Sequence, residues 1–163
     1  MTYKLWFKVK PVGFVKKLDD RKSSIKILKK YACCLEQIEY FSHLVILYWM
    51  NKVPKELRRD LKVKPRHIDT PTLGVFSTRF PARPNPIGAT TVKLLSRKGA
   101  TLVVEGLDAE DGTPVIDVKP YIPIFDKPSG RVKLPWWVLK HLKDHDHQHP
   151  SSFKEILKLV ELE

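Results

Sequence analysis

The loop Arg79–Gly88 combines hydrogen-bonding side chains with a backbone that proline stiffens. It carries Arg79, Arg83 and Asn85 among Pro81, Pro84 and Pro86. Proline fixes its own φ and restricts the residue before it, so such a loop loses little entropy when a ligand binds. An arginine fork suits a carboxylate or a phosphate. We predict a binding or catalytic role for this loop, against the alternative of a proline-stiffened connection between strands.

A second polar loop, Asp108–Thr113, supplies carboxylates. Asp108 and Asp111 are acceptors suited to an ammonium group or to hydroxyl groups. The alternative for the pair Asp111-Gly112 is a tight hairpin turn, which is a common use of that dipeptide. The turn and the binding site can be the same feature.

The sequence lacks the motifs of several enzyme classes. It contains no Gly-x-Ser-x-Gly elbow, no His-Glu-x-x-His pair, no Walker loop and no Gly-x-Gly-x-x-Gly fingerprint. This argues against the common hydrolases and against an ordinary Rossmann-type methyltransferase.

The histidines and cysteines do not indicate a metal site. The C-terminal histidines His141, His145, His147 and His149 are spaced as in a flexible linker rather than as ligands. Cys33 and Cys34 are adjacent, which suits neither a disulfide nor a zinc site. We expect small, partly buried thiols in a reducing compartment.

The positive charge is concentrated in the first part of the chain. The net charge is +12 over 163 residues. Residues 1–66 hold 17 Lys and Arg against 6 Asp and Glu, a net of +11, and residues 67–163 hold 13 against 12, a net of +1. Such asymmetry favours a polyanionic partner, nucleic acid above all, against the alternative of a lysine-rich solvated face.

The apolar segments favour a cytoplasmic protein. The run Leu44–Met50 is far too short to span a bilayer, and the lysine-dotted N-terminus has no apolar signal core. We therefore expect a cytoplasmic protein without membrane contact.

Strand patterns must position the two polar loops. We expect strands over Tyr3–Val9, Val12–Val15, Ser24–Leu28, Leu44–Met50, Gly74–Ser77, Thr90–Leu95, Thr101–Glu105 and Pro114–Lys119. Leu44–Met50 is continuously apolar and is predicted to be buried on both faces. We predict a hairpin turn at Arg97–Ala100, a short helix over Tyr31–Tyr40 and a basic, exposed excursion over Val53–Arg66. His43 is expected to be buried and hydrogen-bonded, with a site role as the alternative.

These short strands with few helices predict a mainly β fold, an open or closed β-barrel with short helices. The C-terminus adds a helical tail: Pro135–Lys143 is helically patterned, and Ser152 with Glu155 forms a capping box before a second apolar face that ends at Val160. Trp136 and Trp137 suit packing better than base stacking. We predict a barrel domain over residues 1–127 and a helical extension over 128–163.

Two long motifs resemble the TsaA-like (TrmO-like) family. The first is Gly74-Val75-Phe76-Ser77-Thr78-Arg79 followed by Arg83-Pro84-Asn85-Pro86-Ile87-Gly88; the second is Leu107-Asp108, Asp111-Gly112-Thr113-Pro114-Val115 and Asp117-Val118-Lys119-Pro120-Tyr121. Phe41-Ser42-His43-Leu44 also matches. The similarity covers about Pro11 to Asp126.

The resemblance implies a function. Characterised members of this family are S-adenosylmethionine-dependent tRNA methyltransferases, and they methylate the exocyclic amino nitrogen of a threonylcarbamoyl-modified adenosine beside the anticodon. The resemblance also implies a single-sheeted β-barrel, a homodimer and a cofactor site near the dimer interface. Methyl transfer would be direct, with catalysis by orientation and without a metal.

The resemblance also assigns roles to individual residues. The cofactor contacts fall on Asn51, Lys52, Arg79, Ala89, Asp108, Asp111, Gly112 and Thr113. Beyond the resemblance, we expect substrate contacts at Arg83, Asn85, Lys119 and Tyr121, and Asp111 or Asp117 as the base if one is needed. Lysines and arginines of residues 1–66 would hold the tRNA backbone.

The N-terminal half of the site departs from the family pattern. Leu18–Lys26 is short and lacks proline, Asn51-Lys52 replaces a His-Gln pair, and Phe80 replaces a small residue. A non-catalytic RNA-binding or regulatory protein on the same barrel is therefore the alternative function.

Overall fold

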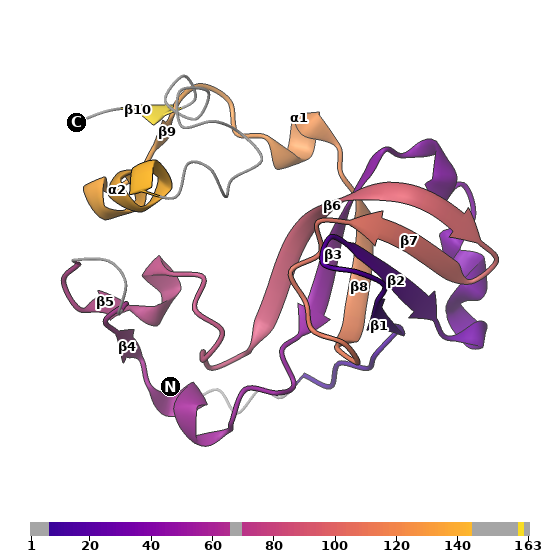
Figure 1. The fold of residues 1–163 in the computed structure, drawn as a ribbon, viewed down its shortest axis with the longest axis horizontal. Coiled ribbons are helices and arrows are strands. Elements are labelled where there is room, and N and C mark those ends of the chain that lie inside the picture. Colours follow the sequence, from indigo (N-terminus) through magenta and orange to yellow (C-terminus); the bar gives the residue numbers. More distant parts are fainter. Residues whose placement is uncertain (1–6, 66–69, 145–159, 162–163) are drawn as a thin grey trace. The chain divides into compact units, whose positions relative to one another are not determined.

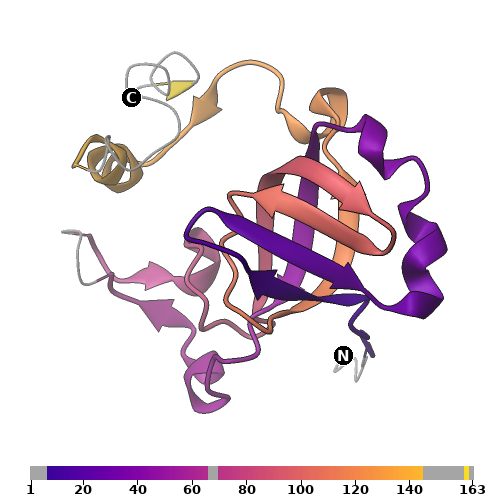
Figure 2. The same ribbon diagram turned by 45° about the vertical axis from the view of Figure 1, so that its right-hand side comes forward.

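The computed structural model describes residues 7–65, 70–144 and 160–161. Six strands form one closed antiparallel barrel in the order β1-β2-β7-β6-β3-β8, closed by pairing of β8 with β1. They are β1 (Gly13–Lys17), β2 (Lys22–Ile27), β3 (His43–Trp49), β6 (Ile87–Lys98), β7 (Thr101–Glu105) and β8 (Pro114–Pro120). Figures 1 and 2 show these strands curving round a common axis. The prediction of a mainly β, single-sheeted barrel is confirmed.

The barrel has an apolar core because each strand sends alternate side chains inward. Ile25 of β2, Leu44 and Ile46 of β3, and Leu102 and Val104 of β7 have no exposed surface. Each such aliphatic side chain contributes roughly 1.5–3 kcal/mol to folding through burial. This core fixes which side chains of every strand face outward.

The predicted strands agree best with the structure where apolar and polar residues alternate regularly in the sequence. Thr101–Glu105 is β7, and the turn before it joins β7 to β6 as expected. The expected strand Thr90–Leu95 is the middle of the longer β6. The prediction that Leu44–Met50 is buried on both faces is wrong, because in β3 buried residues alternate with partly exposed ones. A strand in a closed barrel presents only one face to the core.

Two other elements differ in type from the prediction. The segment Tyr31–Tyr40 contains two 3₁₀ helices, η1 (Lys29–Leu35) and η2 (Ile38–Tyr40), rather than one helix. Gln37 separates them, because its φ of 66° is left-handed and interrupts the helical backbone.

Gly74–Ser77 is not a strand of the barrel. Only its first residue is in the short strand β5 (Leu73–Gly74), which pairs with β4 (Lys62–Val63), and Val75–Ser77 is the 3₁₀ helix η4. Phe7–Val9, the described part of the strand expected over Tyr3–Val9, forms no strand.

The described residues divide into two compact units. One unit combines described residues of 1–60 and 80–121; it contains the barrel, η1, η2 and η3 (Glu56–Arg59). The other unit combines described residues of 61–79 and 122–163. It contains β4, β5, η4, α1 (Pro123–Asp126), α2 (Trp136–Asp144) and the parallel pair β9 (Val132–Lys133) and β10 (Val160–Glu161). The predicted domain boundary at residue 127 stays a prediction.

The helix expected over Pro135–Lys143 is α2. Trp136 and Trp137 meet edge to face with ring centroids 5.8 Å apart, and Trp136 remains 54% exposed. Val160 was expected on a helical face, but it belongs to strand β10 and pairs with Val132 of β9. The capping box at Ser152 lies outside the described residues, as do His145, His147 and His149. In the described part of the chain, no helix is long and apolar enough to cross a membrane.

Candidate functional site

One end of the barrel brings together four segments that lie far apart in the sequence. They are Val15–Lys17, Tyr48–Lys52, Pro86–Ala89 and Leu107–Thr113, and we call them the rim. The backbone N–H of Met50 donates to the carbonyl of Pro86 at 2.8 Å, which joins the end of β3 to the start of β6. The N–H of Gly112 donates to the carbonyl of Val15 at 2.9 Å, which joins the β7–β8 loop to β1.

Tyr48 connects the barrel core to the rim. It is only 5% exposed, and its hydroxyl donates to the backbone carbonyl of Asp108. The same hydroxyl lies 3.2 Å from Oγ1 of Thr90. The tyrosine therefore holds the Asp108 loop against β3 and β6.

Gly88 leaves the space that the Tyr48 ring occupies. Gly88 pairs with Tyr48 across β3 and β6, and a Cβ at Gly88 would lie 2.3 Å from Cε2 and Cζ of that ring. A glycine inside a strand commonly marks such a close approach. The glycine of the Pro-Ile-Gly sequence is thus required by packing.

The Asp108–Thr113 loop is fixed by several bonds. The backbone N–H of Lys17 donates to Oδ1 of Asp111 at 2.8 Å, and Nζ of Lys17 donates to the carbonyl of Leu107 at 2.9 Å. The N–H of Thr113 donates to the carbonyl of Glu110 at 3.2 Å, and Gly112 has a φ of 76°. Asp111-Gly112 therefore forms a tight turn, because a type II turn needs positive φ at its third residue. The prediction of a hairpin is wrong, since β8 pairs with β1 and β3 and not with β7.

The residues of the Asp108–Thr113 loop differ in exposure and therefore in role. Asp108, Asp111 and Gly112 are exposed, whereas Thr113 is only 3% exposed and exchanges backbone bonds with β1 and the turn. Asp108 and Asp111 can meet a ligand from solvent. Thr113 instead anchors the loop.

Asn51 and Lys52 follow the end of β3 and are exposed. Nζ of Lys52 lies 2.6 Å from Oε2 of Glu110, so the pair bridges β3 to the loop. Because both side chains are largely exposed, such an ion pair contributes about 0–1 kcal/mol. Glu110, Tyr48 and Lys17 were not identified from the sequence. Gly88 was identified only as part of a motif, without its packing role.

Ala89, the last rim residue of β6, and Asp117 of β8 lie on the outer face of the barrel. Both pair with Leu47, one across β6 and the other across β8. Oδ1 of Asp117 accepts the N–H of Val118 at 2.9 Å, and Oδ2 lies 2.7 Å from Nζ of Lys119. The hydrogen bond to Asp117 and its negative charge raise the pKa of Lys119 above 10.5.

Tyr121 lies at the opposite end of β3 from the rim. Its N–H donates to the carbonyl of His43, the first residue of β3, at 3.0 Å. The seven residues of β3 span roughly 20 Å. The barrel therefore does not bring Tyr121 together with Asn51 and the Asp108 loop.

The arginine–proline loop leads into β6. Pro86 is fully buried and Ala82 is 5% exposed, so the loop is anchored on apolar contacts. Arg83 is partly buried and Asn85 is exposed, while the Asn85 carbonyl accepts the N–H of Ile87 at 2.7 Å. Arg79 is exposed and ends a segment of the second compact unit, so it is described with that unit.

Two further predictions need correction. His43 is exposed rather than buried, although its Nδ1 lies 2.9 Å from Oγ of Ser42 as a hydrogen-bond partner. Its ring meets that of Tyr121 edge-on at 6.5 Å. Cys33 and Cys34 are both exposed rather than partly buried, because η1 lies outside the barrel wall. Among the described residues, no group of three His, Cys, Asp or Glu side chains is placed to hold a metal.

Comparisons with known proteins give one consistent result. The family model described as "tRNA-methyltransferase O N-terminal domain" matches residues 15–127. An S-adenosyl-L-methionine-binding protein of Archaeoglobus fulgidus is 40% identical over 131 residues, which cover 72% of this chain and 91% of that protein. A mouse tRNA (adenine(37)-N6)-methyltransferase is 45% identical over 93 residues, which cover 57% of this chain and 21% of the mouse protein.

The structural match covers more of this chain than the sequence matches do. A probable S-adenosyl-L-methionine-binding protein of Archaeoglobus fulgidus is 45% identical over 113 residues, and these span 69% of this chain but only 30% of that protein. The crystal structure of TrmO from Pseudomonas aeruginosa superposes with a TM-score of 0.60 at 22% identity, covering 95% of this chain and 80% of the other. The structural match supports the barrel fold alone.

Proposed function

Because the chain belongs to the tRNA-methyltransferase O N-terminal domain family, we propose that it is an S-adenosyl-L-methionine-dependent methyltransferase that acts on tRNA. The acceptor is the exocyclic amino nitrogen of an adenosine beside the anticodon, in its threonylcarbamoyl-modified form. The observation that carries the proposal is the rim, where Tyr48, Lys17 and the Gly112 turn hold exposed carboxylates in a fixed arrangement.

The rim fits the chemistry of this cofactor. Asp108 and Asp111 are exposed acceptors for an ammonium group and for ribose hydroxyls, and a stiff loop binds with little ordering cost. Asn51, Lys52, Ala89 and Gly112 line the same end of the barrel. We propose Arg79 as a cofactor contact from the family motif alone, since a guanidinium can pair with a carboxylate in fork geometry. Bound S-adenosyl-L-methionine supplies an activated methyl group for direct transfer to nitrogen.

The residues of this chain then act by orientation and proton transfer. Asp111 has an oxygen available for the proton and Asp117 does not. The Lys17 N–H engages one oxygen of Asp111, whereas both oxygens of Asp117 are hydrogen-bonded or ion-paired. The other oxygen of Asp111 can take the proton that the adenine nitrogen loses. Arg83 and Asn85 would hold phosphate or base edges, and Lys119 and Tyr121 more distant parts of the tRNA.

We include a homodimer in the proposal. Val45, Leu47 and Trp49 form the outward row of β3, and all three are partly exposed, as is Ile87 beside Trp49. A second copy of the chain would cover this apolar row. The proposed location is cytoplasmic, and the two free thiols at Cys33 and Cys34 fit a reducing compartment.

Mass spectrometry of tRNA nucleosides tests the activity. Incubation of the full chain with S-adenosyl-L-methionine and tRNA should add one methyl group to the modified adenosine. Salt-sensitive binding of tRNA without affinity for S-adenosyl-L-methionine would instead support a non-catalytic RNA-binding or regulatory protein on the same barrel.

Calorimetry with Arg79 variants tests the cofactor site. Arg79→Ala should abolish binding of S-adenosyl-L-methionine and leave the circular dichroism spectrum unchanged. Arg79→Lys, which keeps the charge but loses the planar fork, should bind with intermediate affinity. Unchanged affinity of Arg79→Ala would remove this residue from the site.

A further inference from the structure

The outer surface of the barrel has one face that is rich in lysine. Strand register assigns eleven outward positions of β1, β2, β7 and the far half of β6 to this face. In rows across the strands they are Phe14, Lys26, Thr101 and Lys98; then Lys16, Ser24, Val103 and Ser96; then Lys22, Glu105 and Lys93. We call these residues the basic face.

The positive charge of the basic face is largely uncompensated. All five of its lysines are exposed, and its one carboxylate, Glu105, pairs with Arg21 at 3.3 Å. Within the described part of the chain, Lys16, Lys26, Lys93 and Lys98 make no ion pair with a carboxylate. The face therefore presents free positive charge to a polyanion.

The rest of the outer surface is different, so the charge is not simply spread over the barrel. The outward row of β3 consists of His43, Val45, Leu47 and Trp49. Beside it on β8, Lys119 is neutralised by Asp117 at 2.7 Å. If the lysines served only to keep the surface solvated, they would be spread over the whole barrel. Instead, one face is apolar and another is rich in lysine.

The neutral residues of the basic face also suit nucleic acid. Ser24, Ser96 and Thr101 offer hydroxyl groups between the lysines, and such groups commonly contact phosphate and sugar. Phe14 is 41% exposed and pairs with Lys26. An exposed aromatic ring beside cations on a sheet is the arrangement on which single-stranded bases stack.

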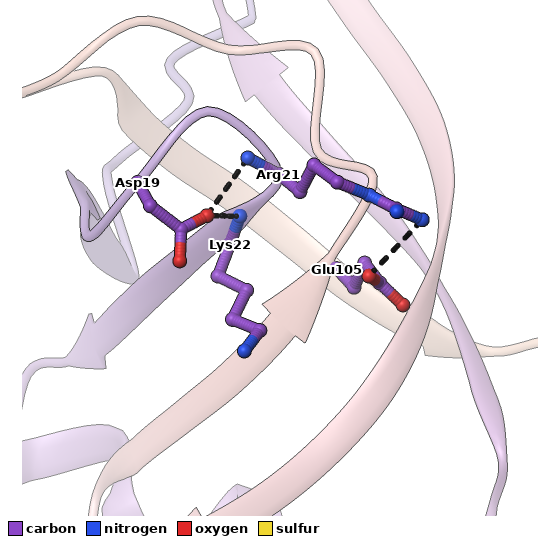
Figure 3. A network of polar contacts seen from close by, with 4 residues as sticks. All are labelled: Asp19, Arg21, Lys22 and Glu105. Atoms are coloured by element: carbon purple, nitrogen blue, oxygen red, sulfur yellow. Dashed lines mark hydrogen bonds and ion pairs between the residues drawn. The ribbon is translucent and has the colours of Figure 1, made fainter.

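The basic face reaches the rim through the β1–β2 turn. Figure 3 shows this turn: Oδ1 of Asp19 accepts the N–H groups of Arg21 and Lys22 at 2.8 and 2.7 Å, while Arg21 extends to Glu105. The carbonyl of Arg21 accepts the N–H of Gly106 at 2.9 Å. Gly106 directly precedes the rim segment Leu107–Thr113, so the lysine rows lead to the Asp108 loop.

We propose that the basic face binds the phosphodiester backbone of the RNA substrate and guides it to the rim. The identification of the RNA as tRNA rests on the proposed function. The lysines hold the backbone without reading its sequence, and Phe14 stacks on an unpaired base.

Fluorescence anisotropy with labelled tRNA at several salt concentrations tests the proposal. The test variant is Lys26→Ala/Lys93→Ala/Lys98→Ala, which lies outside the rim. The matched control is Lys127→Ala/Lys140→Ala/Lys143→Ala, which removes the same charge from exposed positions of the second compact unit. The test variant should lose about tenfold or more in affinity and flatten the slope of log K against log salt by about two to three, because each lysine releases roughly one counterion. The control should change both by much less.

A second variant and a second ligand separate the alternatives. Phe14→Leu should weaken binding of single-stranded RNA several-fold and leave the salt slope unchanged, since it removes stacking but no charge. Both triple variants should bind S-adenosyl-L-methionine as the parent protein does. Failure of the proposed cofactor would show as no binding in any variant, including the parent.

The proposal is overturned if the test variant binds tRNA as tightly as the control and with the same salt slope. It is also overturned if the three lysines are needed for binding to anionic lipid vesicles but not to tRNA. In that case the basic face would be a membrane-docking surface.

Discussion

Tyr48 occupies an inward position of β3, yet its hydroxyl ends in the polar rim. The ring packs in the barrel core while the hydroxyl contacts Asp108 and Thr90. A buried tyrosine commonly finds such a partner for its polar end. The position of the Asp108 loop therefore depends on the packing of the core. A substitution in the core beside Tyr48 should also shift the rim.

Gly88→Ala tests this coupling. The added Cβ would overlap the Tyr48 ring, so the ring must move and release the Asp108 carbonyl. We expect a loss of about 1–3 kcal/mol in the free energy of unfolding, as for overpacked cores. Cofactor affinity should fall as well. Urea unfolding and calorimetry measure both quantities.

Gly74→Ala is the matched control. No atom lies within 4 Å of a Cβ placed at Gly74, and its φ of −64° suits alanine. Its unfolding midpoint should stay close to that of the parent protein. If Gly88→Ala behaves in the same way, the ring of Tyr48 is not confined as described.

Asp19 predicts a pH dependence for the β1–β2 turn. Hydrogen bonds from the backbone N–H groups of Lys22 and then Arg21 lower the pKa of its carboxyl below 3.8. A lowered folded pKa means that the anion stabilises the fold above the unfolded value. This stabilisation is lost as the pH falls from about 4 through the lowered folded pKa.

Asp19→Ala should therefore lower the melting temperature at neutral pH. The difference from the parent protein should shrink as the pH is reduced below about 4, where the parent carboxylate also becomes protonated. Asp20→Ala is the control, since among the described residues Asp20 forms no side-chain hydrogen bond. A difference that is constant from pH 7 to pH 3 would show that the carboxylate charge is irrelevant to this turn.

At the scale of elements, the β7–β8 loop is both a turn and a proposed ligand wall. Gly112 supplies the positive φ, and its neighbours in the loop are bonded to β1 on either side of the turn. The strain of any other residue at this position would thus act on the position of Asp111. Stability and cofactor binding should change together when the turn is altered.

Gly112→Ala and Gly112→Asn form a graded pair. Alanine in the left-handed region costs about 1–2 kcal/mol, and asparagine tolerates the region better. We expect the loss of unfolding free energy and of cofactor affinity to be larger for alanine than for asparagine. Chemical denaturation and calorimetry on both variants check the order, and equal effects would show that the left-handed conformation is not what the site needs.

The sequence predicts elements well where the signal is local. The strand Thr101–Glu105 and its hairpin turn follow from alternation and a single glycine, and both are correct. The Asp111-Gly112 turn is equally local. By contrast, Gln37 interrupts the expected helix over Tyr31–Tyr40 through a left-handed φ, and no glycine at that position indicates the break.

The rim could be predicted only in part, because its contacts are distant in the sequence. Tyr48 lies 42 residues from Thr90 and 60 from Asp108, and only the register of β3 with β6 brings them together. No local pattern encodes that register. Two residues were the available signals. A tyrosine within an apolar run needs a partner for its hydroxyl when it is buried, and a glycine at the start of β6 is unusual inside a strand.

At the scale of the whole molecule, the outer surface of the barrel carries two faces of different chemistry. The basic face covers β1, β2, β7 and the far half of β6, and the apolar row covers β3. In the proposed homodimer, a second copy would bury the apolar row and leave the basic face open to RNA. Assembly and RNA binding should therefore be separable by mutation.

Leu47→Arg tests the dimer. Leu47 is the middle residue of the apolar row and is partly exposed on the outer face of the barrel, so the barrel itself should tolerate the change. In a dimer interface, which buries about 800 Å² on each partner, an unpaired arginine at the centre opposes assembly. Sedimentation equilibrium should report a dimer for the parent protein and a monomer for Leu47→Arg.

Val103→Arg places the same charge at the centre of the basic face and is the control. It should remain dimeric, because Val103 lies outward on β7 and away from β3 in the strand order of the barrel. Since it adds positive charge among the lysines, it should keep or raise the affinity for tRNA, whereas Leu47→Arg should alter assembly. A parent protein that is monomeric at every concentration would contradict the dimer, and a monomeric Val103→Arg would place the interface on the basic face instead, where it would compete with RNA.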